Sequence, residues 1–302
     1  MRVRAILNRG GGSLLRTGSD PRKRIAAAFA AERVDADILL LDGSRLSDAF
    51  REAAGDSSVD AVVAGGGDGT VSSAAGALAG TDKPLGILPL GTLNHLARDA
   101  GIPVDIEGAV ATVAAGHSRP IDVGEVNGRL FVNNSAIGLY PRMVRDRDQQ
   151  RDQLGRSKRL AMLVASLRVL ARFRRHRLTI ELGGLSAPLE TPLLFIGNNV
   201  YETSLLTLGS RTALDQAELC LYAPLARGRQ HFLGLGVRSL VGLSKQTDFV
   251  GLTGIGEAVV RSRRAALAVS LDGEAVTIAT PLRYRIRPAA LRLIVPRPAG
   301  ER

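Results

Sequence analysis

Apolar and polar positions follow two alternating patterns over residues 1–122. Short apolar runs rich in β-branched residues occupy 3–7, 38–41, 59–64 and 85–88, and alanine-rich stretches with helical spacing lie between them. Continuous apolar runs are typical of strands buried on both faces, and connecting helices make neighbouring strands parallel. This part of the chain is therefore predicted to form a doubly wound α/β domain with a parallel sheet.

From residue 118 the pattern changes to strands joined by tight turns. Asn127-Gly128 lies between two apolar runs and signals a two-residue hairpin, and the stretches LTIELGGLSAPLE and ALAVSLDGEAVTI repeat this pattern. An antiparallel β-sandwich is predicted, with helices near 157–173 and 229–243. The expected domains are 1–122 and 123–287, and the segment 288–302, which contains the apolar run LRLIVP, is expected to return to the first domain.

Composition sets the broad class. The chain has 302 residues, of which 45% are hydrophobic, enough for two packed cores. Its one cysteine, Cys220, rules out an internal disulfide and is expected to be buried and reduced, which fits the cytoplasm. The start MRVRAILNRG has no secretory or transit pattern, and no run approaches the roughly 18 apolar residues of a spanning helix. Any membrane contact is expected to be peripheral.

The formal net charge is +11 and the pI is near 10.8, which favours polyanionic partners such as nucleic acid, an anionic lipid surface or nucleotide phosphates. Aromatic residues make up only 4% of the chain and there is no tryptophan. The sequence shows neither helix-turn-helix nor zinc-ligand spacing. Nucleic acid is therefore not an expected partner.

A glycine-rich stretch, VVAGGGDGTV, contains the end of the third predicted strand. Gly65, Gly66 and Gly67 leave backbone amides without a Cβ in the way, and a helix predicted to begin near Thr70 adds its positive end, which is typical of a phosphate cradle. Neither the Walker lysine nor the dinucleotide spacing is present. Asp68 would repel polyphosphate unless a divalent cation lies between them or the carboxylate orients a donor group. The alternative is an ordinary strand-to-helix turn.

A second polar loop follows the next predicted strand, within GILPLGTLNHLARDAGIP. It contains Gly91, Thr92 and Asn94 and leads into a helical stretch at His95. In parallel sheets, ligands bind beyond the carboxyl ends of the strands. The two loops are therefore expected to lie at one edge of the sheet.

The blocks GGGDGT and PLGTLNHLARDAGIP resemble the two most recognisable blocks of the diacylglycerol kinase catalytic-domain family, the soluble lipid kinases. IDVGEVNGRLFVNNSAIG, LLFIGNN and SLDGE follow in the family's order, so the resemblance covers nearly the whole chain. A lone glycine-aspartate-glycine block is weak, because NAD kinases and phosphofructokinases share it, whereas five ordered blocks are specific. The resemblance implies a nucleotide-binding first domain, a β-sandwich lipid-substrate domain and an active site in the cleft between them.

The same resemblance implies ATP and Mg²⁺ as ligands. The positions that it assigns to ATP are Asn8, Gly65, Gly66, Gly67, Asp68, Gly69, Thr70, Gly91, Thr92 and Asn94. Asp68 and Asp122 match acidic positions of a water-linked magnesium network. Asp68 is therefore expected to serve both the nucleotide and the metal.

Three positions depart from the family's pattern. Arg9 replaces a proline in the first glycine loop, which puts the conformation of that loop in question. His95 stands where the magnesium network often has an aspartate, although a neutral imidazole can still hydrogen-bond a metal-bound water. Gln216 replaces a carboxylate in the loop TALDQAEL, where many bacterial members bind a structural metal. An amide oxygen is a poorer Mg²⁺ ligand, so that structural site is expected to be weak or absent.

The block VSLDGEAV places Glu274, by the same resemblance, as the base that takes the proton of the lipid hydroxyl, and Asp68 is the second expected catalytic residue. Asp272 and Gly273 would form the turn that presents Glu274. A positioned carboxylate typically contributes about 10²- to 10⁴-fold to such a transfer. Taken alone, Asp-Gly between apolar strands is a hairpin turn, and the glutamate after it is usually solvated.

The segment 142–177 holds 12 arginine or lysine residues against 3 aspartates. Its part SKRLAMLVASLRVLARFRRHR combines apolar residues at helical spacing with basic flanks, as in an interfacial helix. Basic residues near an anionic surface contribute about 1 kcal/mol each. The alternative is an amphipathic helix that packs on the sandwich and keeps a solvated basic face.

The leading hypothesis is a lipid kinase that transfers the γ-phosphoryl group of ATP to a hydroxyl of diacylglycerol or a related lipid alcohol. Its expected partner is lipid at an anionic membrane surface, reached from the cytoplasm, and a homodimer is compatible with the sequence. One alternative is a soluble metabolite kinase of the NAD kinase type. Another is a non-catalytic lipid- or nucleotide-sensing relative, in which Arg9, His95 and Gln216 reflect the loss of catalytic function.

Overall fold

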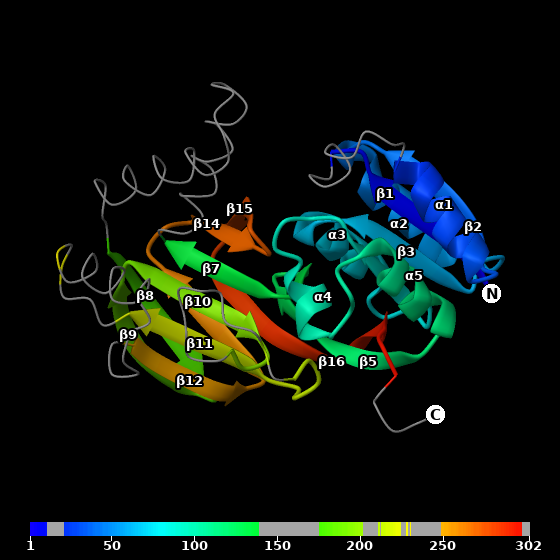
Figure 1. Ribbon diagram of the computed structural model, residues 1–302. Helices are drawn as coiled ribbons and strands as arrows, with labels where there is room; N and C mark the ends of the chain where they lie inside the picture. The colour runs from blue at the N-terminus through cyan, green and yellow to red at the C-terminus, as the bar shows by residue number, and fades with distance from the viewer. Residues whose placement is uncertain are drawn as a thin grey trace. The chain divides into compact units, whose positions relative to one another are not determined.

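A computed structural model describes the fold (Figure 1). The described residues are 1–10, 21–138, 175–201, 211, 213–224, 228, 230 and 249–297. The chain divides into two compact units. Unit 1 comprises Met1–Val123, Ala213–Asp215 and Arg287–Arg302, and unit 2 comprises Gly124–Thr212 and Gln216–Ile286.

Unit 1 contains a parallel sheet in the order β2-β1-β3-β4, joined by the last part of β16. The strands are β1 (Arg2–Asn8), β2 (Asp35–Leu41), β3 (Ala61–Gly66), β4 (Leu85–Pro89) and β16 (Leu282–Ile294). Every residue of β3 and β4 is buried, as their continuous apolar runs predict. The predicted doubly wound parallel sheet is therefore confirmed.

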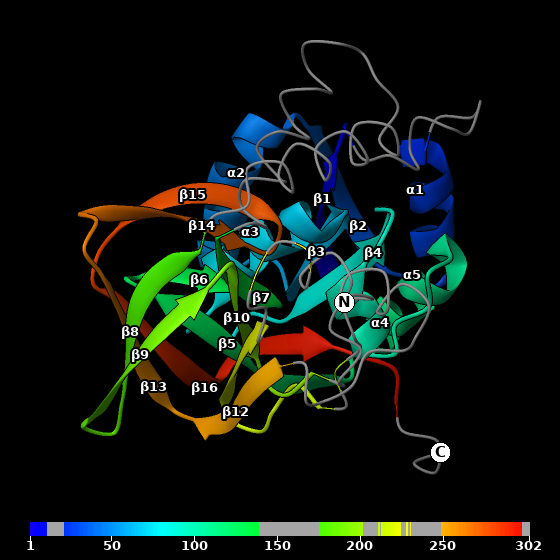
Figure 2. The same cartoon turned by 90° about the vertical axis from the view of Figure 1, so that its left-hand side faces the viewer.

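Helices cover both faces of this sheet (Figure 2). They are α1 (Pro21–Ala31), α2 (Gly43–Gly55), α3 (Asp68–Leu78), the short α4 (His95–Asp99) and α5 (Ile106–Ala115). α1 packs with α5, and α2 packs with α3. Because β3 and β4 are neighbours, the loops that follow their carboxyl ends emerge at one edge of unit 1.

The C-terminal part of the chain extends unit 1. In β16, Leu293 pairs in parallel with Leu85 of β4. β5 (Ser118–Val126) begins in unit 1 and carries Asp122. Both strands run on across the division between the units, so each contributes residues to both of them.

Unit 2 is an antiparallel sandwich. One sheet has the order β16-β13-β8-β9 and the other has the order β12-β11-β10-β7-β14-β15, while β6 pairs with β5. Its strands are β6 (Arg129–Phe131), β7 (Asn134–Gly138), β8 (His176–Leu182), β9 (Leu185–Thr191), β10 (Leu193–Asn198), β11 (Leu219–Pro224), β12 (Phe249–Ile255), β13 (Glu257–Ser262), β14 (Ala266–Leu271) and β15 (Glu274–Ala279).

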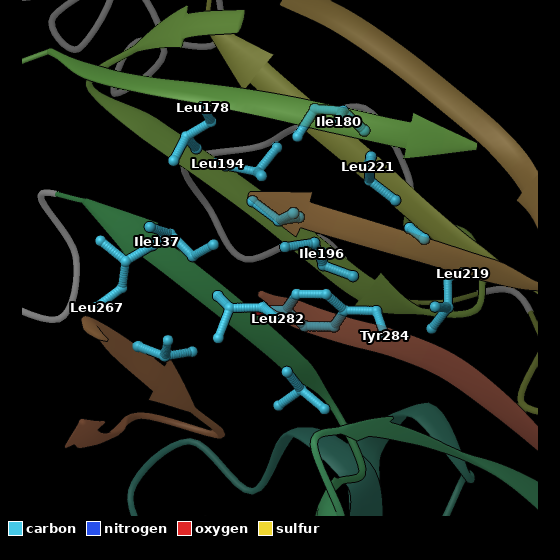
Figure 3. Close-up of a cluster of buried hydrophobic side chains, with 14 of the residues drawn as sticks. Ile137, Leu178, Ile180, Leu194, Ile196, Leu219, Leu221, Leu267, Leu282 and Tyr284 are labelled. Carbon is cyan, nitrogen blue, oxygen red and sulfur yellow. The ribbon is translucent and has the colours of Figure 1, made fainter. Parts of the chain in front are cut away.

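Alternating residues of both sheets fill the core of unit 2. Ile137 and Ile196 from one sheet meet Ile180, Leu282 and Tyr284 from the other, and all are buried (Figure 3). Each fully buried aliphatic side chain contributes about 1.5–3 kcal/mol to folding. The predicted sandwich is therefore confirmed, since its inward positions form one continuous core.

The three predicted hairpins are present. Asn127-Gly128 joins β5 to β6, Gly183-Gly184 joins β8 to β9, and Asp272-Gly273 joins β14 to β15. All six turn residues have positive φ, as two-residue hairpins of this kind require. The helices predicted near 157–173 and 229–243 lie outside the described residues, Gln230 excepted. Within the described part of the chain, no helix has the length and hydropathy needed to cross a membrane.

Candidate active site

The amino terminus of α3 forms the first part of the candidate site. β3 ends at Gly66, Gly67 is the N-cap residue, and α3 begins at Asp68, two residues before the predicted start at Thr70. The first amides of a helix have no acceptor within the helix. The amides of Asp68 and Gly69 are of this kind, and the positive end of the helix dipole lies beside them. This end of α3 therefore has the donors that bind phosphate.

Close packing explains why two residues of the stretch are glycines. Gly65 and Gly66 are buried strand residues, not loop residues. A Cβ on Gly65 would collide with the side chain of Leu7, and one on Gly66 would collide with that of Thr70. These two glycines bring β1 and the first turn of α3 close to β3, and the half-buried part of the stretch begins only at Gly67.

The loop after β4 touches the loop after β3 through its backbone. A Cβ on Gly91 would collide with the Cα of Gly67 and would come within 2.6 Å of Asn94 Oδ1. Asn94 has a left-handed backbone (φ 53°) and is buried. Its Oδ1 accepts the Gly91 amide at 2.9 Å, and its Nδ2 donates to the Gly91 carbonyl at 3.1 Å. Asn94 therefore shapes this loop from inside, whereas Thr92 is exposed.

Asp68 joins the two loops by hydrogen bonds. Its Oδ2 accepts the backbone amide of Asn94 at 3.2 Å, and its Oδ1 accepts that of His95 at 2.7 Å. These amides open α4, so the carboxylate caps a helix that belongs to the other loop. From the sequence, Asp68 was expected either to lie beside a divalent cation or to orient a donor group. In the structure its carboxylate orients the backbone amides of Asn94 and His95.

Asn8, at the end of β1, adds a third strand end to the same place. Its Nδ2 donates to Thr70 Oγ1 at 3.1 Å, and its Oδ1 accepts the Gly10 amide at 3.0 Å. Thr70 itself is buried in the first turn of α3. Unit 1 thus brings together the strand ends that carry Asn8, the glycine stretch and the Gly91–Asn94 loop.

The donor set allows a test of whether Mg²⁺ fits. Each carboxylate oxygen can accept more than one hydrogen bond, so Asp68 retains lone pairs beyond those used by two amides. Asp122 is buried, and its Oδ1 accepts the Ala289 amide at 2.9 Å. Among the described residues, no group of three or more His, Cys, Asp or Glu side chains could hold an ion. Oxygen donors of the Asp68 kind are the ligands that Mg²⁺ takes, so this carboxylate fits the ion chemically.

Glu274 lies in unit 2, as the first residue of β15, and is exposed. It pairs with Leu271 across the turn formed by Asp272 and Gly273, whose φ values are 47° and 85°. The turn predicted to present Glu274 therefore exists. Its role as a base stays a prediction.

The sequence missed a buried polar network beside this turn. Asp272 accepts three backbone amides from the segment 132–134, and Arg211 contacts the same segment. Arg211, Asn133 and Asn198 are all buried. The signal was present in the blocks FVNNSAIG, LLFIGNN and SLDGE, whose asparagines and aspartate follow apolar runs as strand-end anchors do.

The loop with Gln216 is held by protein groups. In unit 1, Asp215 forms an ion pair with Arg119 at 3.0 Å. In unit 2, the backbone amide of Gln216 donates to Asn199 Oδ1 at 2.9 Å. The weak or absent structural metal site stays a prediction.

The basic segment 142–177 lies outside the described residues except for its last three, 175–177. Of these, Arg175 and Arg177 lie 3.5 and 3.7 Å from the carboxylate of Glu190. The role predicted for this segment at a membrane surface is therefore left to experiment.

Comparison with known proteins places the chain among lipid kinases. The diacylglycerol kinase catalytic domain matches residues 2–126. A protein of Pseudomonas aeruginosa named "Probable lipid kinase YegS-like" is 32% identical over 249 residues, which cover 78% of this chain and 76% of that protein. Diacylglycerol kinase of Bacillus subtilis is 37% identical over 129 residues, which cover 41% of this chain and 42% of that protein.

Solved structures show the same fold. A crystal structure of a Bacillus anthracis str. Sterne protein aligns with a TM-score of 0.77 and 23% identity over 99% of this chain and 98% of that one. A diacylglycerol kinase from the same organism aligns with a TM-score of 0.72 and 22% identity, over 98% and 97% of the two chains. With these relatives and the strand-end loops of unit 1, the chain belongs to the diacylglycerol kinase catalytic-domain family and is a lipid kinase that uses ATP.

Proposed function

We propose that this kinase transfers the γ-phosphoryl group of ATP to a hydroxyl of diacylglycerol or of a related lipid alcohol. The observation that carries the nucleotide assignment is the Asp68 carboxylate, which holds the loop after β4 against the amino terminus of α3. That arrangement leaves the first amides of an 11-residue helix at the sheet edge where α/β folds bind phosphates. The family's curated members support the lipid acceptor.

In the proposed complex, the amides of Asp68 and Gly69 and the loop with Thr92 donate hydrogen bonds to the phosphate oxygens. Asn8 orders the third strand end next to Thr70. Asp68, through water, and the phosphates themselves would hold Mg²⁺. The ion would spread the negative charge that develops on the transferred group.

Glu274 is the proposed base. The lipid hydroxyl oxygen attacks the γ-phosphorus, a new O–P bond forms, the bond from that phosphorus to the bridging oxygen of ADP breaks, and the hydroxyl proton passes to the Glu274 carboxylate. The exposed position of Glu274 at a hairpin end supports this role, because a base must reach a substrate that comes from outside the protein. Catalysis of this type rests on position more than on a strong base.

The acceptor dissolves only in a lipid phase, so the kinase is proposed to work at the inner face of a membrane, reached from the cytoplasm. The surplus of basic residues in 142–177 supports attraction to anionic lipid. Sedimentation with vesicles tests this. Binding to phosphatidylglycerol vesicles that falls with salt supports the proposal, and equal binding to purely zwitterionic vesicles contradicts it.

The decisive test of the activity combines the purified full chain, γ-labelled ATP and mixed micelles that contain diacylglycerol, a sphingoid base or a total lipid extract, with NAD as a soluble acceptor. Label is expected in lipid and not in NAD. Glu274→Gln is expected to lower kcat by about 10²- to 10⁴-fold. Glu257→Gln, at the exposed first position of strand β13, is the matched control and is expected to retain activity. Labelled NAD without labelled lipid, or full activity of Glu274→Gln, overturns the proposal.

A further inference from the structure

The carboxylate of Asp272 turns back onto the protein although it lies in a hairpin turn. Its Oδ2 accepts the Val132 amide at 2.9 Å, and its Oδ1 accepts the amides of Asn133 and Asn134 at 2.8 and 3.0 Å. Only 9% of the residue is exposed. The Asp272 amide in turn donates to the Asn134 carbonyl at 2.9 Å. The turn is therefore fixed to the segment that leads into β7.

Arg211 holds the same segment by its acceptors. Its Nη1 donates to the Val132 carbonyl at 2.6 Å, and its Nη2 donates to Asn133 Oδ1 at 2.9 Å. The guanidinium is 5.5 Å from the centre of the Tyr201 ring, and the residue is 4% exposed. The Asp272 carboxylate thus binds the backbone amides of segment 132–134, and the Arg211 guanidinium binds a carbonyl and a side-chain oxygen of the same segment.

Charge-assisted hydrogen bonds of this kind are about twice as strong as neutral ones. Both charged groups are buried. Losing the Asp272 carboxylate would remove the acceptor of three backbone amides of segment 132–134, and losing Arg211 would remove a donor from the Val132 carbonyl and from Asn133 Oδ1. The turn and segment 132–134 are therefore joined by four hydrogen bonds of Asp272.

We propose that Asp272 is a positioning residue for Glu274, an inference that rests on the proposed function. Glu274 follows the turn directly and opens β15, so the anchored turn sets the direction from which its side chain departs. A displacement of about 1 Å in a reacting group can cost about 100-fold in rate. The buried anchor of Asp272 prevents such a displacement.

A second turn in unit 2, formed by Asn127 and Gly128, has the same backbone shape but offers different hydrogen-bonding partners to its first side chain. Asn127 and Gly128 have φ values of 47° and 81°, close to those of Asp272 and Gly273. Asn127 Oδ1 accepts the Arg283 backbone amide at 2.7 Å, while its Nδ2 donates to the carbonyls of Ala279 and Pro281. An amide side chain suits a site that offers both donors and acceptors, and a carboxylate suits one that offers three amides.

The experiment is a double-mutant cycle of Asp272→Asn and Glu274→Gln, with kcat and the KM for ATP measured in diacylglycerol micelles. Asn at 272 keeps the size of the side chain but sets an NH₂ group against an amide. Asp272→Asn is expected to lower kcat about 100-fold, with the KM for ATP changed less than about threefold. In the Glu274→Gln background, Asp272→Asn is expected to lower kcat no further, because it acts through Glu274.

The matched control is Asn127→Asp, which sets a carboxylate against two carbonyls in the equivalent turn. It is expected to lower the melting temperature as Asp272→Asn does and to leave kcat within about twofold of the wild type. If Asp272→Asn does not accumulate as a folded protein, Asp272→Glu replaces it in the cycle. That variant keeps the charge and lengthens the arm by one methylene, and it is expected to lower kcat at least about tenfold.

The outcomes separate two kinds of failure. If Glu274→Gln lowers kcat but Asp272→Asn does not, or if the two losses multiply in the double variant, the positioning role is wrong and the proposed function stands. If Glu274→Gln keeps full kcat, the base assignment itself is wrong and the positioning role falls with it.

Discussion

The Asp68 carboxylate accepts the backbone amide of His95 at 2.7 Å, although 27 positions separate the two residues. With the second bond to the Asn94 amide, Asp68 caps α4 and connects the two phosphate-binding loops of the proposed site. The Asp68 carboxylate, which the sequence suggests as a residue of a metal site, therefore also holds the backbone of the loop after β4 in place. We call this pair of hydrogen bonds the Asp68 brace.

Replacing Asp68 tests this brace. In Asp68→Asn one carboxylate oxygen becomes an NH₂ group that faces an amide, so one of the two bonds to α4 is lost. Hydrogen bonds to charged groups contribute about 1.5–3 kcal/mol, so affinity for a non-hydrolysable ATP analogue is expected to fall by about 10- to 100-fold in calorimetric titration. The loss is expected with and without Mg²⁺.

The control for Asp68 is Asp105→Asn. Asp105 also caps a helix, because its Oδ1 accepts the Gly108 amide of α5 at 2.7 Å. This variant is expected to lose stability and to keep its affinity for the ATP analogue. A loss in Asp68→Asn that occurs only with Mg²⁺ would contradict the brace and assign Asp68 to the metal alone.

Two glycine-to-alanine changes with opposite expected signs test the contact between the loops. Gly91→Ala sets a Cβ against the backbone of Gly67, and overpacking of this kind costs about 1–3 kcal/mol, with weaker ATP binding. Gly76 lies on the exposed side of α3, where a Cβ would meet open space, so Gly76→Ala is expected to stabilise by about 0.5–1 kcal/mol. Urea unfolding measures both, and equal effects would contradict the contact.

Two buried serines of unit 2 differ in their partners. Within the described residues, Ser270 Oγ in β14 has no hydrogen-bond partner, whereas Ser135 Oγ lies 3.0 Å from the hydroxyl of Tyr284. Ser270→Ala is expected to be neutral or stabilising, because it removes a buried polar atom that makes no bond. Ser135→Ala is expected to lower the free energy of unfolding by about 1–3 kcal/mol, because the Tyr284 hydroxyl loses its partner. The reverse order in chemical denaturation would contradict the assigned bonds.

Cys220 is expected to be unreactive in the folded protein. Burial raises the pKa of its thiol to about 11, and its Sγ donates to the Asn199 carbonyl at 3.1 Å. The thiolate is the reactive form, so a disulfide reagent at pH 8 is expected to modify the chain only after denaturation. Rapid modification of the folded protein would contradict the burial.

The raised pKa of Cys220 also determines in which direction its contribution to folding stability changes with pH. The folded state binds the thiol proton more tightly than the unfolded state, whose pKa is 9.0. The stability that this provides is complete below pH 9 and is lost as the pH rises through about 11. Relative to Cys220→Ala, the wild type is therefore expected to lose stability over this range, and a difference that does not vary with pH would contradict the shift.

Local pattern was sufficient for the elements that carry the site. The continuous apolar runs of β3 and β4 predicted a buried parallel sheet, and the Asn-Gly, Gly-Gly and Asp-Gly pairs predicted hairpins that the structure contains. The start of α3 was predicted two residues late. Gly67 is the N-cap residue, so α3 begins one residue after it, at Asp68. The position of this boundary depends on the contact between Gly67 and Gly91 of the loop after β4.

Side-chain roles were harder to predict, because they depend on partners far along the chain. The blocks FVNNSAIG, LLFIGNN and SLDGE mark polar residues at strand ends, but they do not show which partners those residues bind. That the Asp272 carboxylate meets the amides of segment 132–134, and that Arg211 binds the same segment, is visible only in the structure. Asp272 and Asn127 occupy equivalent turn positions, and only the neighbouring strands explain why one is an acid and the other an amide.

The sequence by itself determined the two kinds of sheet, the turns and the family, because these follow from periodicities and motifs over a few neighbouring residues. Tertiary structure alone decided which hydrogen bonds the charged side chains make. Those bonds join residues that folding brings together from distant parts of the chain, as with Asp68 and His95, so their geometry exists only after the strands have packed.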